Sequence, residues 1–188
     1  MRITPLSLAL ATLMITSSSS AWTAQNINSW DKEPSEFLGI PLHGDFKAQT
    51  PACPNTPERQ PTLCRSSTSK TDRFEIRGLP YIPINLGYQV FVTLQGNAID
   101  ELMLTGNASS LELVDDFLRD TFGQPGSSLS HRIQLESGAT YEIKTSTWKG
   151  KKVAIHFQRD EDDLSRYAVI ISRSSDPSKS AATAIPSE

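Results

Sequence analysis

The residues best suited to bind a ligand in this sequence are a tryptophan and the lysines around it. Trp148 is followed by Lys149, Lys151 and Lys152 and is preceded by Lys144. An indole ring stacks on flat groups and ammonium groups attract anions, so this segment predicts a docking point for an anionic or aromatic ligand. The alternative is a tryptophan packed on a sheet, with lysines that keep the neighbouring strand edge soluble and unpaired.

The residue types that commonly carry catalysis form no recognisable motif. The histidines His43, His131 and His156 lack metal-ligand spacing, and none can be assigned a nucleophile and an orienting acid. The acidic run at 160–163 lacks the alternating ligands and the turn glycine of a calcium loop. The sequence also lacks a phosphate-binding glycine motif and a G-x-S-x-G turn. We therefore predict no catalytic residue, no metal and no cofactor.

The two cysteines, Cys53 and Cys64, lie on either side of a proline-rich stretch. In an oxidising compartment this spacing favours one disulfide between them. Free or intermolecular thiols are one alternative. A metal site is another, although two further ligands would be needed and no histidine pattern supplies them.

The start of the chain has the features of a secretory signal peptide. Residues 1–21 contain the basic Arg2, an apolar run over 6–15, and small residues up to Ala21. We therefore expect cleavage after Ala21. The alternative, an uncleaved membrane anchor, needs about 20 apolar residues, more than this run provides. The net charge of −3 gives no electrostatic reason to expect nucleic acid or anionic lipid as a partner.

The remaining sequence predicts three segments. Residues 22–72 read as an irregular arm followed by a disulfide-tied, proline-rich loop, 73–173 as an α+β domain, and 174–188 as a disordered tail. Within the domain, period-two alternation predicts two strands before an amphipathic helix over about 110–122, and four strands after it. Short connections force antiparallel pairing, so we expect a two-layer β-β-α-β-β-β-β fold with the helix on one face of the sheet.

One stretch resembles a known group of proteins. The predicted helix ends in Phe122-Gly123-Gln124-Pro125, and the strands after it hold Trp148 and close with 153–157 and 167–171. This pattern is similar to the BamE-like and β-lactamase-inhibitor-like bacterial envelope proteins. The resemblance covers residues 109–172 and implies a domain that binds proteins and catalyses nothing. This chain departs from that group because it shows one helix, two strands ahead of it, and no lipid-anchor cysteine. Its opening Phe37-Leu38-Gly39-Ile40, with later cysteines, resembles uncharacterised exported proteins of Gram-negative bacteria.

These features together predict an exported, non-enzymatic binding protein of the periplasm, or one that is secreted, with another protein as its partner. It would be of inhibitor or immunity type, and Trp148 or Trp30 would form exposed aromatic anchors. A structural component of an envelope or secretion assembly is the first alternative. An enzyme with an unrecognised site is the second. No segment after the signal peptide is long and apolar enough to span a membrane.

Overall fold

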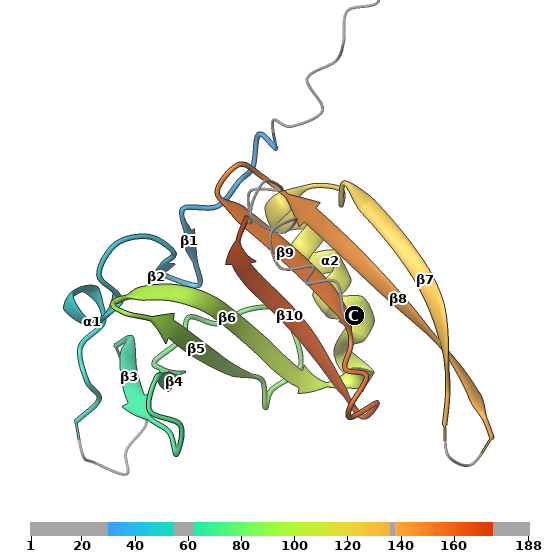
Figure 1. Ribbon diagram of the computed structural model, residues 1–188, viewed down its shortest axis with the longest axis horizontal. Coiled ribbons are helices and arrows are strands. Elements are labelled where there is room, and N and C mark those ends of the chain that lie inside the picture. Colours follow the sequence, from blue (N-terminus) through green and yellow to red (C-terminus); the bar gives the residue numbers. More distant parts are fainter. Residues whose placement is uncertain (1–29, 55–61, 136–137, 175–188) are drawn as a thin grey trace, which may run out of the picture.

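A single antiparallel sheet with a helix on one face makes up most of the structure (Figure 1). The computed structural model describes residues 30–54, 62–135 and 138–174. The strands of this sheet are β3 (Cys64–Ser67), β4 (Arg73–Arg77), β5 (Gln89–Gln95), β6 (Ala98–Asn107), β7 (Ser127–Gln134), β8 (Thr140–Lys149), β9 (Val153–Arg159) and β10 (Arg166–Arg173). Their spatial order is β3-β4-β5-β6-β10-β9-β8-β7. The predicted antiparallel α+β class is therefore confirmed, although the number of strands is not.

The path of the chain explains where the helix lies. After the β5–β6 hairpin the chain enters α2 (Leu111–Phe122), which carries it to the far edge of the sheet, where β7 begins. It then returns strand by strand until β10 pairs with β6. The apolar side of α2 is buried against the sheet. It consists of Val114, Leu118 and Phe122.

The start of the helix differs from the sequence expectation. Ser109 and Glu112 have the spacing of a capping box, yet the chain first forms a 3₁₀ turn, Ala108–Ser110. The side chain of Asn107 caps this turn by accepting a hydrogen bond from the Ser109 N–H at 2.9 Å. Asp115 and Arg119, four residues apart on α2, form an ion pair with a separation of 2.8 Å.

The segment predicted as an arm and loop contributes to the folded domain. Strands β3 and β4 extend the sheet beyond the six expected strands. Before them lie a two-stranded ribbon, β1 (Glu36–Phe37) and β2 (Ile40–Pro41), and the single-turn helix α1 (Phe46–Gln49). Phe37, Ile40 and Phe46 are buried in the same core cluster as the sheet and α2. The predicted boundary at residue 72, between the loop and the α+β domain, therefore does not separate two cores, because residues on both sides of it belong to one.

The predicted disulfide between Cys53 and Cys64 is present, with an S–S distance of 2.07 Å. It lies at the β3 edge of the sheet, where the segment around Ala52 pairs with Arg65. The Arg65 N–H donates to the Pro51 carbonyl, and the Arg65 carbonyl accepts from the Cys53 N–H, both at 2.9 Å. The outer side of β3 is therefore closed by backbone pairing that the disulfide holds in place.

Two predictions fall outside the described residues. These are the signal peptide with its cleavage after Ala21, and nearly all of the tail over 174–188. Within the described part of the chain, no helix combines the length and apolar character needed to cross a membrane.

Candidate functional site

Trp148 lies in the core, which corrects the expectation of an exposed anchor. Its side chain is 1% exposed, and its Nε1–H donates to the Gly123 carbonyl at 2.8 Å. Alternate residues of β8 face α2, and Ser146, two positions earlier, is buried on the same side. The structure therefore shows the alternative, a tryptophan packed between sheet and helix.

Trp30 also supports the end of α2. Its Nε1–H donates to the Phe122 carbonyl at 2.9 Å, and its half-buried ring meets the Phe122 ring edge-on at 5.8 Å. Lys32 Nζ reaches the Asp120 carbonyl at 3.4 Å. The last carbonyls of a helix lack partners within the helix and carry partial negative charge. Two indoles and an ammonium group therefore cap the C-terminus of α2, so both tryptophans have structural roles.

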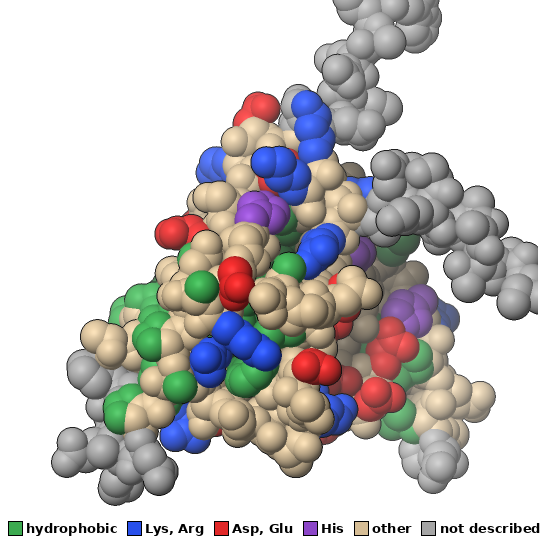
Figure 2. Space-filling view, turned by 60° about the vertical axis from the view of Figure 1, so that its left-hand side comes forward, with side chains coloured by type: hydrophobic (Ala, Val, Ile, Leu, Met, Phe, Trp, Pro, Cys, Tyr) green, Lys and Arg blue, Asp and Glu red, His purple; other side chains and the backbone are tan. Residues whose placement is uncertain are grey.

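The lysines around Trp148 do not share one surface. Lys149 borders a depression with the two tryptophans, Lys152 borders another with His43, and Lys144 borders a third beside α2. Lys151 is exposed in the turn between β8 and β9. On the face seen in Figure 2, acidic and basic side chains are also interspersed rather than gathered by sign. The structure thus separates the lysines that the sequence places together.

Glu33 ties the N-terminal segment to the sheet. Its Oε1 accepts hydrogen bonds from the backbone N–H groups of Lys152 and Val153 at 2.5 and 2.8 Å. Burial alone would raise the pKa of this carboxyl, but those backbone N–H groups, that of Lys151 and the charge of Lys152 lower the pKa overall. A Cβ at Gly150 would lie 2.4 Å from the Glu33 carboxylate, so any side chain here would displace Glu33 from these hydrogen bonds.

We expect Glu33→Gln to lower the free energy of unfolding at pH 7 by about 1 kcal/mol. Because folding lowers the pKa of Glu33, its contribution is present above the carboxyl pKa of the unfolded chain. It is lost as the pH falls through the lower pKa of the folded chain. Urea unfolding at several pH values from 7 to 3 should show that the difference in the free energy of unfolding between the unaltered protein and Glu33→Gln shrinks as the pH falls. A constant difference would contradict this role.

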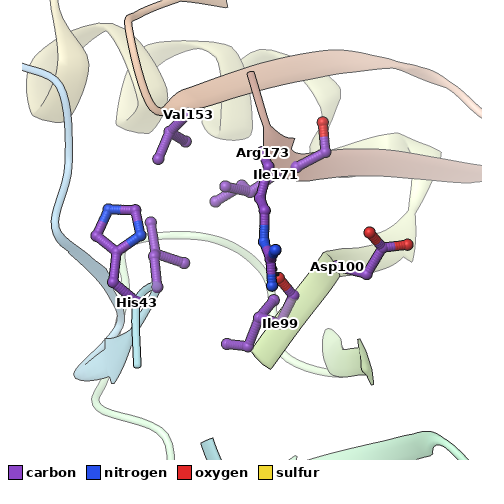
Figure 3. Close-up of a pocket in the computed structure, with 8 residues that line it drawn as sticks. His43, Ile99, Asp100, Val153, Ile171 and Arg173 are labelled. Carbon is purple, nitrogen blue, oxygen red and sulfur yellow. Dashed lines mark hydrogen bonds between the residues drawn. The ribbon is translucent and has the colours of Figure 1, made fainter. Parts of the chain in front are cut away.

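A small depression beside His43 is too small to hold a ligand. His43 and Arg173 point toward it, Ile99, Val153 and Ile171 form its walls, and the Asp100 carboxylate turns away (Figure 3). Arg173 is held by a hydrogen bond from its Nε to the Ile99 carbonyl at 2.9 Å. The enclosed volume is about 10 Å³, no more than one water molecule needs.

The other histidines lie on the face of the sheet opposite α2. His131 Nε2 is 3.4 Å from the Glu161 carboxylate, and His156 Nδ1 is 3.2 Å from Thr147 Oγ1. Burial and the nearby Lys149 charge lower the pKa of His156. Among the described residues, no three His, Cys, Asp or Glu side chains converge as metal ligands would.

A groove runs between α2 and the neighbouring strands; it is larger than the small depression beside His43 but smaller than the open ones beside Lys152 and Lys149. It has a volume of about 270 Å³, and we call it the α2–β8 groove. Its lining residues are Leu111, Glu112 and Asp115 from α2, Glu142, Lys144 and Ser146 from β8, and Phe157 and Arg159 from β9. Phe157 and Ser146 are buried, whereas Glu112, Glu142 and Lys144 are exposed. The groove therefore has a buried floor and a charged rim of both signs.

One polar atom in the α2–β8 groove has no partner. Asp115 binds Arg119 through its Oδ2, but its Oδ1 is shielded from solvent and has no hydrogen-bond partner among the described residues. Opposite, the Arg159 guanidinium lies 5.6 Å from the Tyr141 ring centre and donates to the Leu164 carbonyl. Both Asp115 and Arg159 are therefore held in position by contacts within the chain.

The β7–β8 hairpin forms an outer wall that projects from the sheet. β8 pairs with β9 only over Ser146–Lys149, whereas its remaining residues pair with β7 alone (Figure 1). Leu129 and Tyr141 on this hairpin are 71% and 43% exposed. Sequence reasoning missed this wall and the groove, because periodicity identifies strands but not how far each extends beyond its neighbour.

The chain matches no protein-family model, no curated protein and no solved structure. The resemblance of residues 109–172 to the BamE-like group therefore stays an expectation from the sequence. Any function has to be inferred from the geometry of the chain itself.

Proposed function

We propose that this chain is an exported, non-enzymatic protein that binds another protein through the α2–β8 groove, in the manner of an inhibitor or immunity protein. One observation carries the proposal: the groove combines an apolar floor at Phe157 with a rim that carries both charges. Protein interfaces commonly have an apolar centre and a polar rim.

The chemistry of the groove indicates what the partner presents. Phe157 offers apolar contact below, while Glu142 and Lys144 can pair with charges of either sign at the rim. A loop that carries an apolar residue beside an arginine, lysine or amide fits this arrangement.

The compartment we propose is the periplasm or the cell exterior. A disulfide such as Cys53–Cys64 persists in oxidising compartments and is rare in the cytosol. The basic, apolar and small-residue pattern of residues 1–21 agrees with export. The partner is then a protein of the same compartment.

Site-specific crosslinking in the native compartment tests the proposal. A photoreactive amino acid at Glu142, on the rim of the groove, should crosslink one defined protein that mass spectrometry can identify. The matched control is the same amino acid at Lys70, an exposed residue between β3 and β4. The same adducts from both positions, or no adduct from Glu142, would exclude the groove as the binding surface.

A further inference from the structure

The two edge strands of the eight-stranded sheet, β3 and β7, differ in the backbone pairing on their outer sides. The β3 edge is paired with the segment around Ala52 and held by the disulfide. At the other edge, no backbone segment within residues 30–54, 62–135 and 138–174 pairs with the outer side of β7. Among the described residues, one edge is therefore paired at Arg65 and the other has no neighbouring strand.

The open edge lacks several of the features that prevent strands from pairing with other chains, although it carries the charged Arg132. Natural edge strands are short, bulged, or interrupted by proline or lysine. β7 is eight residues long, contains no proline, glycine or lysine, and pairs with β8 without a register shift. Its side chains are almost all exposed, and Leu129 is the most exposed of its apolar ones. This edge is suited to pair with a strand.

We propose that the strand that occupies this edge is β7 of a second copy of the chain. Two copies would pair antiparallel about a two-fold axis, with His131 opposite His131 of the second copy. The sheets would then join into one, with both α2 helices on the same side. A two-fold arrangement of this kind uses one surface twice and forms a closed dimer.

The sequence of β7 complements itself in this register. Leu129 lies opposite Ile133 of the second copy on the face away from α2, and Ser130 lies opposite Arg132. Cross-strand apolar pairs stabilise a sheet, whereas like charges directly opposite each other destabilise it. A shift that centres the pair on Arg132 places two arginines opposite each other. A shift that centres it on Ser130 places Leu129 opposite histidine, so of these three registers the one centred on His131 is favoured.

The dimer is independent of the proposed partner site. The residues that line the α2–β8 groove come from α2, β8 and β9, and none comes from β7. A chain that fails to dimerise can therefore still bind a partner protein through the groove. Conversely, if the protein dimerises but no partner is found, only the proposed function fails.

The mass of the purified protein tests the dimer. Light scattering during gel filtration should give twice the mass of one chain, and Leu129→Lys should give the mass of one chain because lysine protects an edge. Leu129 is 71% exposed, so this variant should fold, which circular dichroism can verify. The matched control is Leu86→Lys at a position that is 88% exposed, and it should remain dimeric. A single-chain mass for the unaltered protein at all concentrations would overturn the proposal.

Disulfide trapping tests the register. Directly opposed residues in antiparallel strands have Cα atoms about 4.5–5.5 Å apart, within the reach of a disulfide. His131→Cys should therefore form a covalent dimer under mild oxidation, whereas Leu129→Cys alone should not. A mixture of Leu129→Cys and Ile133→Cys chains should crosslink as heterodimers. Crosslinking of His131→Cys no faster than Ser69→Cys, an exposed control, would contradict the register.

Discussion

Replacing Trp148 with alanine should lower the free energy of unfolding by about 3–5 kcal/mol. The substitution leaves a cavity between β8 and α2, where the indole is almost completely buried. It also removes the N–H that satisfies the Gly123 carbonyl at the end of the helix. Urea unfolding followed by circular dichroism measures the loss.

Two further variants separate the contributions at this position. Trp148→Phe keeps an aromatic ring in the core but loses the hydrogen bond to Gly123, so its loss should lie well below that of alanine. Lys149→Ala, at the exposed neighbouring position, should change the free energy of unfolding by less than about 0.5 kcal/mol. A stable Trp148→Ala protein would show that this indole is not the core element described here.

Removing the disulfide should have the second largest effect. Replacing Cys53 and Cys64 together by serine should cost about 2–3 kcal/mol, because the bridge restricts the unfolded chain over a sequence separation of 11. The double variant avoids a free thiol. Urea unfolding measures this loss.

The same variant should also loosen the β3 edge. The Arg65 N–H donates to the Pro51 carbonyl just beside the bridge, so its hydrogen exchange should become faster. Amides in β9, in the middle of the sheet, serve as the internal control. Unchanged unfolding energy together with unchanged protection of Arg65 would show that the disulfide is not needed to close this edge.

Local patterns predicted the elements whose signals lie within a few residues. The helix near 110–122 and the strands from β5 to β10 show regular alternation or helical periodicity, and the structure contains all of them. The strands β3 and β4 were missed because they are four and five residues long and lie beside a proline-rich stretch. β4 is stable because Phe74 and Ile76 reach the common core, and β3 is held by its pairing with β4 and by the disulfide; all of these are tertiary effects.

The site was harder to predict because it depends on distances between segments. The sequence groups Trp148 with its lysines, but along the extended strand Lys144 lies four residues from the tryptophan, in the α2–β8 groove. Lys151 and Lys152 lie beyond the end of β8, so the lysines diverge while the tryptophan enters the core. The α2–β8 groove joins residues from 111 to 159 and has no local signature. The sequence of β7 alternates apolar and polar residues as a half-buried strand does, whereas the structure leaves nearly all of its side chains exposed.

The affinity of the crosslinked partner for groove variants tests the central claim most directly. Lys144→Glu reverses a charge on the rim of the α2–β8 groove, and Lys149→Glu makes the same change on the same strand outside it. Calorimetry with the purified partner should give a Kd about tenfold or more weaker for Lys144→Glu, with little change for Lys149→Glu. Equal affinities for both variants and the unaltered protein would contradict binding through the groove.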